Sequence, residues 1–187
     1  MTTDLLSLDA TAVMLIGHDV AALDTAELDL PTPCTGWTVA DLIAHMNERH
    51  AAVIAATSTP VPAPTGDPRD AFAVIAAHWV TAMEQTGSSV TLPRAGTLPT
   101  EQVLSIHFVD MLVHRWDIAR ALGISRETPA RLAEIALPIA RSITAPGSPL
   151  NGPDGVYHPS LTENPTRPAM DNIAALLGRD PHHAPSR

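Results

Sequence analysis

Apolar side chains recur along most of the chain at intervals of three and four residues, which is the spacing of one face of an α-helix. This periodicity predicts five long helices and one short closing helix, over residues 5–28, 38–57, 69–86, 100–122, 129–143 and 170–177. Segments rich in proline, glycine and serine interrupt the pattern, most densely at residues 60–68 and 145–168. Residues 88–99 are β-prone or irregular. The pattern therefore indicates a helical protein.

The helix predicted over residues 100–122 carries a stripe of imidazoles and carboxylates on an otherwise apolar surface. His107, Asp110, His114 and Asp117 follow one another at spacings that place all four within roughly 80° of the helix circumference. A merely solvated stripe would more often carry Glu, Lys, Arg and Gln. His and Asp are weaker helix formers but good metal ligands at neutral pH. The stripe is therefore either a wet face of the helix or a set of ligands that converges on a metal ion.

Two further features of this helix bear on that choice. Asp110 and His114 form an i, i+4 pair whose side chains project to the same side, so they could share one ion. Glu101, Ser105 and Arg115 lie roughly opposite the stripe. They offer a separate candidate for the face that meets solvent.

A second informative segment, LPTPCTGWTVADLIAHMNERH, runs from Leu30 to His50. Thr38 is typical of an N-cap, with Asp41 three residues later in a capping-box position, and His45 follows at the edge of the apolar helix face. Cys34 precedes the helix N-terminus, where a thiolate is favoured, but it also lies in a proline-rich turn in which a small buried thiol packs well. A catalytic and a structural role for Cys34 are both open at this point.

Length and charge narrow the function classes. The 187 residues suffice for one domain, which we expect over residues 1–181, followed by a flexible tail at 182–187. A net charge of −9 argues against nucleic acid, whose phosphates need a basic face. No apolar run is long enough to cross a bilayer and the first residues lack a signal-peptide pattern, so we expect no membrane partner and a cytoplasmic protein. The single cysteine excludes an internal disulfide.

Three motifs, in order, carry a resemblance to a known family. They are TPC-x-GWTV-x-DLI-x-H, the later D-x3-HRWD-I-A-x-A-x-G, and the closing segment DNIAALLGRDP. The first two together resemble the mycothiol-dependent maleylpyruvate isomerase N-terminal domain family, within the DinB-like group of metal-binding helical bundles. The closing segment is similar to that of a single-domain metal-binding branch. The resemblance implies an all-α fold, an antiparallel four-helix bundle with additional short C-terminal helices.

The resemblance also implies a metal site. Carried onto this sequence, the ligands of a divalent ion, commonly zinc with nickel as the alternative, are His45, Asp110 and His114. The family pattern has Glu where this chain has Asp110, whose shorter side chain must shift the ion or lengthen the bond. His107, one turn earlier, is the reserve ligand. Asp117 would orient a ligand histidine, or else is an ordinary surface charge.

Two functions are compatible with such a site. The first is a transferase or isomerase that uses mycothiol or a similar small thiol, activated as a thiolate, on a small acidic substrate. The second is a non-catalytic metal-binding sensor or interaction module. A basic pocket near the metal, with Arg115 and Arg120 as candidates, would favour the enzyme. No catalytic residue is assigned beyond the metal ligands, Cys34 takes a structural role by this resemblance, and a homodimer is expected.

Overall fold

The computed structural model describes residues 4–63, 66–93, 95–151 and 155–183. Within these ranges the protein is mostly helical, with six α-helices, one 3-10 helix and a small two-stranded sheet. The elements in chain order are α1 (Leu5–Ala21), η1 (Glu27–Asp29), α2 (Val39–Ile54), α3 (Pro68–Gln85), β1 (Ser89–Leu92), β2 (Gly96–Pro99), α4 (Thr100–Ala121), α5 (Ala130–Ile143) and α6 (Ala169–Leu176). The helices thus fall where the apolar periodicity predicts them.

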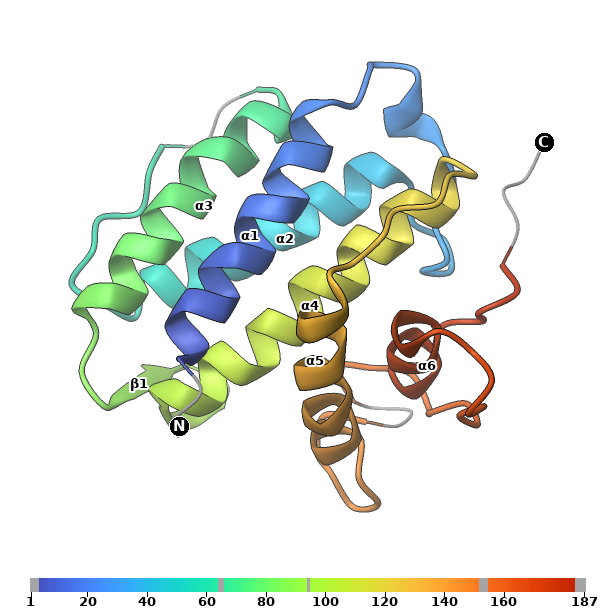
Figure 1. Cartoon of the computed structure of the whole chain (residues 1–187). Helices are drawn as coiled ribbons and strands as arrows, with labels where there is room; N and C mark the ends of the chain where they lie inside the picture. Colours follow the sequence, from blue (N-terminus) through green and yellow to red (C-terminus); the bar gives the residue numbers. More distant parts are fainter. Residues whose placement is uncertain (1–3, 64–65, 94, 152–154, 184–187) are drawn as a thin grey trace.

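The four long helices α1 to α4 form the larger part of the molecule (Figure 1). α1 packs against α4 and α3, and α2 packs against α3. α2 approaches α4 chiefly through side chains, because few of their backbone positions come close. α5 and α6 pack on one another and on α4, on the side away from α3 (Figure 1). α4 is therefore in contact with the elements on both of its sides.

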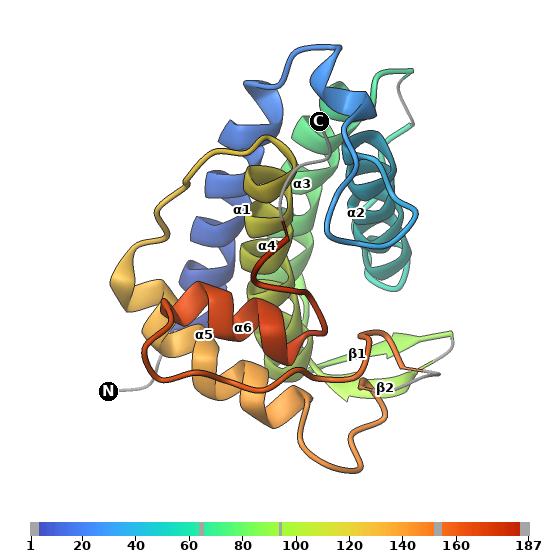
Figure 2. The same ribbon diagram turned by 90° about the vertical axis from the view of Figure 1, so that its right-hand side faces the viewer.

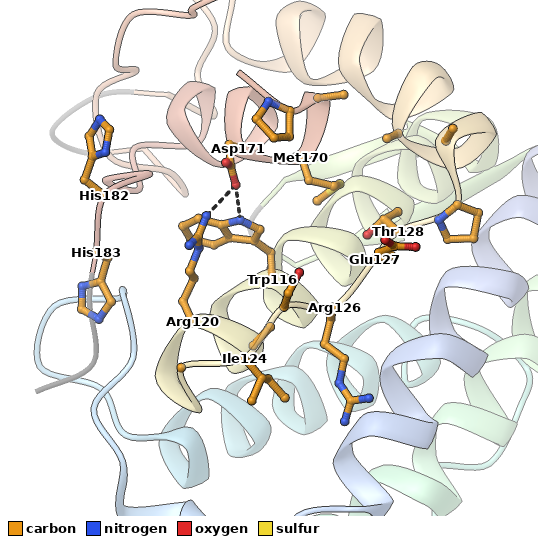
Figure 3. Close-up of a pocket in the computed structure, with 18 of the residues that line it drawn as sticks. Trp116, Arg120, Ile124, Arg126, Glu127, Thr128, Met170, Asp171, His182 and His183 are labelled. Atoms are coloured by element: carbon orange, nitrogen blue, oxygen red, sulfur yellow. Dashed lines mark hydrogen bonds and ion pairs between the residues drawn. The ribbon is translucent and has the colours of Figure 1, made fainter. Parts of the chain in front are cut away.

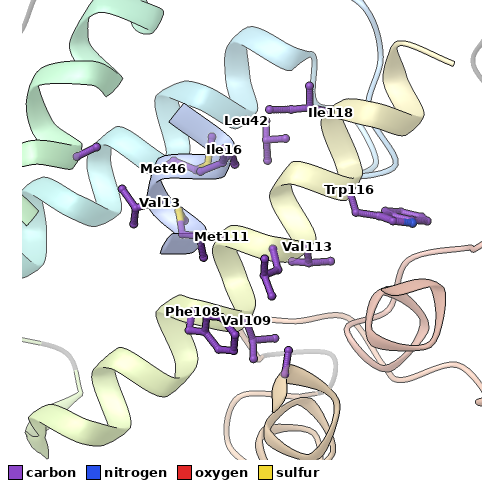
Figure 4. Close-up of a cluster of buried hydrophobic side chains, with 14 of the residues drawn as sticks. Val13, Ile16, Leu42, Met46, Phe108, Val109, Met111, Val113, Trp116 and Ile118 are labelled. Carbon is purple, nitrogen blue, oxygen red and sulfur yellow. The ribbon is translucent and has the colours of Figure 1, made fainter. Parts of the chain in front are cut away.

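The core gathers around α4 because this helix is apolar on nearly all sides. Large side chains that are almost wholly buried come from every long helix and include Ile16, Leu42, Met46, Trp79, Phe108 and Met111, several of which Figure 4 shows converging. The polar stripe of α4 is buried with them, since His107, His114 and Asp117 are at most 8% exposed. The interpretation of the stripe as a wet helix face is therefore wrong. These side chains face neighbouring elements, not solvent.

The first helix ends earlier than its periodicity predicts, at Ala21 rather than residue 28. Asp24 and Glu27 cap each other reciprocally: the Asp24 amide donates to Glu27 Oε2 at 2.8 Å and the Glu27 amide donates to Asp24 Oδ1 at 2.9 Å. This reciprocal pair fixes the turn that leads into the separate 3-10 helix η1. Side-chain capping has here outweighed hydrophobic spacing.

The expectation of an all-α protein needs one correction, because β1 and β2 pair as an antiparallel hairpin. Val90 pairs with Leu98 and Thr91 with Thr97, whose hydroxyls are 2.9 Å apart. β-branched residues favour such a ladder, and Gly96 supplies the positive φ of 72° beside the turn. Figure 2 shows the hairpin at the N-terminal end of α4. The protein is thus mostly helical with one small sheet, not all-α.

The end of α4 follows the predicted glycine signal. Gly123 has φ 66°, its amide donates to the Arg120 carbonyl at 3.1 Å, and the Ile124 amide donates to the Ala119 carbonyl at 3.0 Å. These two bonds form a Schellman motif, which satisfies the last carbonyls of the helix.

No helix in the described ranges combines the length and apolar content that crossing a bilayer requires. The predicted flexible tail lies outside the described residues except for His182 and His183.

Candidate metal centre

His114 is the centre of the polar cluster on α4. Its Nδ1 atom lies 3.2 Å from Asp117 Oδ2, to which it donates a hydrogen bond. Its Nε2 atom is buried and has no hydrogen-bond partner within the described part of the chain. Since buried polar atoms are nearly always paired, such an orphaned nitrogen needs an explanation. An imidazole with one nitrogen held by a carboxylate and the other left open has the arrangement of a metal ligand.

Asp110 lies where a second ligand of the same ion would lie. Its Oδ2 atom is 3.4 Å from His114 Nε2, without hydrogen-bond geometry. Two donor atoms that share one tetrahedral zinc ion, each about 2.1 Å from it, lie about 3.4 Å apart. The spacing of this i, i+4 pair is therefore compatible with a shared ion.

His45, the predicted third ligand, reaches the same place from α2. Its ring centroid is 5.8 Å from that of His114, at an interplanar angle of 83°, and 4.7 Å from the nearer ring of Trp37. Two imidazoles on one ion place their centroids about 5 to 6 Å apart. Burial, and next the neighbouring His114, lower the pKa of His45, so this half-buried imidazole is neutral and able to bind a cation.

The three side chains are neighbours without forming a finished metal cluster. Among the described residues, no three His, Cys, Asp or Glu side chains converge tightly enough to hold an ion as they stand. Asp110 and His114 meet the spacing already, whereas the His45 ring would have to turn toward them. The donor set, one carboxylate oxygen and two imidazole nitrogens, suits zinc or a similar divalent ion.

Asp117 accepts the hydrogen bond from His114 Nδ1 and is completely buried. Arg179 Nη2 donates to Asp117 Oδ2 at 3.1 Å, and the Cys34 thiol donates to the same oxygen at 3.5 Å. The alternative that Asp117 is an ordinary surface charge is therefore wrong. Arg179 belongs to the closing sequence motif, but nothing in its spacing indicated that it would reach α4.

The surroundings of Cys34 favour a structural thiol. Burial, together with the nearby Asp117 carboxylate, raises the pKa of Cys34 to about 12, despite the Arg179 guanidinium 3.5 Å from its sulfur. A thiol that remains protonated at neutral pH is a poor nucleophile. Its hydrogen bond to Asp117 helps to fix the carboxylate that accepts from His114 Nδ1.

Tyr157 is the second residue that sequence reasoning missed. Its hydroxyl donates to Asp110 Oδ1 at 3.0 Å, and its side chain comes from the irregular segment after α5. The tyrosine is 3% exposed. Asp110 thus has one oxygen held by Tyr157 and the other directed toward His114. A segment rich in proline, glycine and serine gave no periodicity from which this contact could be predicted.

The charges of the site are balanced without a metal ion. Although burial disfavours its charged form, Asp110 and Asp117 together raise the pKa of His114 to about 9. Burial by itself would raise the pKa of Asp110, but its interactions with His114 and the charges of Arg179 and His107 together lower it. The pKa of His114 is raised because its two ring nitrogens lie beside the Asp110 and Asp117 carboxylates. A divalent cation that takes the position beside Nε2 would replace its proton.

His107, the reserve ligand, belongs to a different cluster. Its Nε2 atom is 2.7 Å from His50 Nε2, and its Nδ1 atom is 2.5 Å from Asp9 Oδ1. Trp79 Nε1 donates to the other Asp9 oxygen at 2.7 Å, and the His107 ring stacks on the Trp79 ring with centroids 3.8 Å apart. A separation of 2.7 Å between the two imidazole nitrogens is that of a hydrogen bond, shorter than the edge between two zinc ligands. His50 and Asp9 lie among apolar positions of their helices and carried no signal of this network.

The two arginines beside the motif do not line the candidate metal centre. Arg115 was one candidate for the solvent face of α4, but it is 7% exposed, and its Nε donates to Asp19 Oδ2 at 2.7 Å. Arg120 stacks on Trp116 and donates to Asp171 at 2.8 Å. Figure 3 shows the latter group in a cavity of about 1180 Å³ between the end of α4, α5 and α6, whose walls do not include the candidate metal ligands. Arg179, by contrast, contacts the Asp117 carboxylate that bonds to His114.

Comparisons with known proteins agree with this architecture. Residues 15–119, more than half of the chain, match the family described as mycothiol maleylpyruvate isomerase N-terminal domain. Two uncharacterized proteins, from two strains of Mycobacterium tuberculosis, are each 32% identical over 179 residues, covering 91% of this chain and 92% of the relative.

Solved structures of the mycothiol-dependent maleylpyruvate isomerase are similar in fold. The crystal structure of that enzyme superposes with a TM-score of 0.59 at 21% identity, over 75% of this chain and 68% of the other. A mutant of it with one histidine replaced by alanine gives 0.58 at 18% identity, over the same shares. From the match over residues 15–119 it follows that this chain belongs to the mycothiol maleylpyruvate isomerase N-terminal domain family.

Proposed function

We propose that this protein binds a divalent metal ion, zinc or nickel, through His45, Asp110 and His114, and that it acts as an isomerase or transferase dependent on mycothiol. The proposed frame is a DinB-like four-helix bundle of α1 to α4. The observation that carries the proposal is the buried His114 ring: Nδ1 is held by Asp117, and Nε2 has no hydrogen-bond partner among the described residues and faces Asp110 Oδ2 at 3.4 Å.

The residues of the chain have distinct tasks in this proposal. Asp110 and His114 hold the ion from α4, and His45 completes the set from α2. When bound, the ion would stabilise a thiolate at neutral pH and so supply a nucleophile. Asp117 keeps Nδ1 of His114 protonated, which leaves Nε2 as the ligating atom. Cys34 stays a thiol and does not compete with the incoming thiol for the ion.

One observation favours the alternative of a non-catalytic metal-binding module. Tyr157 covers one side of Asp110, and the cavity of about 1180 Å³ lies elsewhere, beside Trp116 and Arg120. A metal ion beside an Asp110 that Tyr157 covers, and remote from this cavity, would have little room for a substrate. Such a site would suit a sensor or an interaction domain. The two functions differ in whether a small thiol reaches the ion.

The first test is the metal content of the protein. The full chain, with His182 and His183 replaced by alanine to remove adventitious binding, is measured by elemental mass spectrometry beside His45→Ala and His114→Ala variants. We expect about one divalent ion per chain, lost in both variants because each removes one of three ligands. His18→Ala is the matched control, since this imidazole is 82% exposed and lies outside the site. A protein that holds no metal and takes up no added zinc would contradict the proposal.

The second test separates the enzyme from the module. Protein loaded with cobalt in place of zinc is titrated with mycothiol and its near-ultraviolet absorption is recorded. A thiolate-to-cobalt band, absent in His114→Ala, is expected for the thiol-dependent enzyme. Metal-loaded protein without such a band would favour the non-catalytic module.

A further inference from the structure

Both carboxylates that flank His114 are held by residues from the C-terminal part of the chain. Tyr157 donates to Asp110 Oδ1 at 3.0 Å, and Arg179 donates to Asp117 Oδ2 at 3.1 Å. Both residues lie beyond the stretch that matches the family, which ends at residue 119. The candidate metal centre is thus assembled from α2 and α4 and enclosed by a segment outside the family match.

The segment that carries the two residues is itself tightly packed. The Tyr157 amide donates to the Leu150 carbonyl at 2.8 Å, and a Cβ atom at Gly155 would come within 2.8 Å of the same carbonyl oxygen. A Cβ atom at Gly178, where φ is 82°, would lie 2.6 Å from the Cβ of His158. Only glycine allows these approaches, and the second brings the residues next to Tyr157 and Arg179 against one another.

Further hydrogen bonds fasten residues 160–163, the part of this segment that follows Tyr157, to α5 and α6. The Ser160 hydroxyl donates to the Leu176 carbonyl at 2.6 Å, and the Leu161 amide donates to the Ala175 carbonyl at 2.8 Å. Arg141 on α5 forms a bidentate ion pair with Glu163. The Tyr157 ring is therefore held in place by its own surroundings, and its hydroxyl meets Asp110 in a set direction.

This direction matters because Asp110 has a short side chain with two equivalent oxygens. With Oδ1 occupied by the tyrosine hydroxyl, Oδ2 remains for a cation, and it lies 3.4 Å from His114 Nε2. A carboxylate free to rotate would lose this orientation for most of the time. Mutating a residue that hydrogen-bonds to a metal ligand commonly weakens metal binding by about 10- to 100-fold.

We propose that Tyr157 is the positioning residue for Asp110, and that through Tyr157 and Arg179 the segment from Gly155 to Arg179 is an integral part of the metal site. The proposal rests on the proposed metal binding. It has a thermodynamic consequence: a metal ion stabilises the docking of this segment by the same factor by which docking strengthens metal binding.

The test uses the fact that Tyr157 is the single tyrosine of the chain. In wild-type protein labelled with 3-fluorotyrosine, the fluorine NMR spectrum contains one tyrosine resonance, which reports on this hydroxyl without further assignment. We expect one equivalent of zinc chloride to shift the resonance in wild-type protein and not in His114→Ala. The measurement does not depend on the folding of any Tyr157 variant.

Metal affinity is measured in parallel by competition with a chromophoric chelator. Tyr157→Phe keeps the buried ring and removes only the hydroxyl, and it should weaken zinc binding by about tenfold or more. The control is Arg141→Gln, which removes a tether of the same segment but no contact to the site; its zinc affinity should stay within about twofold of wild type.

Wild-type zinc affinity in Tyr157→Phe, or a resonance that does not move when wild-type protein is saturated with zinc, would overturn the role of Tyr157 and leave the metal site standing. A wild-type protein that binds no zinc would overturn the proposed function itself.

Discussion

His107 and His114 lie on the same stripe of α4, on either side of Asp110, but their surroundings give them different chemistry. Both ring nitrogens of His107 form hydrogen bonds with protein side chains, to His50 at 2.7 Å and to Asp9 at 2.5 Å. In His114 only Nδ1 forms a hydrogen bond, to Asp117 at 3.2 Å, and Nε2 has no hydrogen-bond partner among the described residues. At the scale of the residue, the number of occupied nitrogens decides which imidazole is a structural partner and which is a candidate ligand.

The His50 imidazole gives stability a specific pH dependence. Burial, and next the charge of His107, hold the pKa of His50 well below 6.5. The unfolded chain therefore binds more protons than the folded one as pH falls below 6.5, so the free energy of unfolding decreases there. One proton contributes at most about 1.4 kcal/mol per pH unit.

His50→Phe should reduce this dependence, as measured by urea unfolding at pH 7, 6 and 5. The variant removes the hydrogen-bond partner of His107 Nε2, so it should be less stable than wild type at pH 7 by about 1–3 kcal/mol. Its free energy of unfolding should then decrease less than that of wild type as the pH falls below 6.5. His18→Phe, at an exposed position, is the control and should follow the wild-type curve. Parallel curves for wild type and His50→Phe would contradict the assignment.

At the scale of the element, local sequence signals are strongest at the start of α2. Thr38 accepts a hydrogen bond from the Asp41 amide at 3.2 Å, and Asp41 Oδ2 accepts one from the Thr38 amide at 2.9 Å. The predicted capping box is thereby confirmed, although aspartate replaces the more usual glutamate. It sets the first turn of the helix that carries His45 toward His114.

Thr38→Ala should lower the free energy of unfolding by about 1 kcal/mol, because it leaves the Asp41 amide in the first turn of α2 without its side-chain acceptor. Chemical denaturation at pH 7 measures the change. Thr81→Ala is the matched control, since this exposed hydroxyl in the interior of α3 bonds only the Ala77 carbonyl and alanine is the better helix former. Equal stability of Thr38→Ala and wild type would show that the cap adds nothing.

At the scale of the whole molecule, α4 is the helix that contacts the largest part of the fold, namely α1, α2, both strands, α5 and α6. It packs against α1 on one side and α5 and α6 on the other, and the Arg115–Asp19 and Trp116–Asp171 contacts join it to both sides. A helix buried around its circumference can open only when the surrounding elements separate. Its amides should therefore report the global free energy of unfolding.

Native-state hydrogen exchange followed by mass spectrometry tests this role. Peptides from α4 should exchange most slowly, and peptides from the β1–β2 hairpin, which is largely exposed, should exchange much faster. The segment around Tyr157 should exchange at an intermediate rate. Comparable rates for α4 and the hairpin would contradict the central position of α4 in the cooperative unit.

The helices were predictable because their signals are local. Apolar spacing located the six helices to within a few residues at most ends, and the Gly123 signal marked the end of α4. The predictions failed where a competing local interaction won, as with the Asp24–Glu27 cap that follows α1. They also could not place Arg115, because helical geometry places a side chain on a face without saying which element covers that face.

The sequence by itself determined the helical architecture, the family and the grouping of Asp110, His114 and Asp117 on one face, since these depend on residue type and on spacing along one helix. Only the tertiary structure decided which of these side chains are buried, that His107 pairs with His50 and Asp9, and that Tyr157 and Arg179 hold the two carboxylates. The reason is physical: these contacts join residues 47 to 98 positions apart, and no periodicity of the chain encodes them.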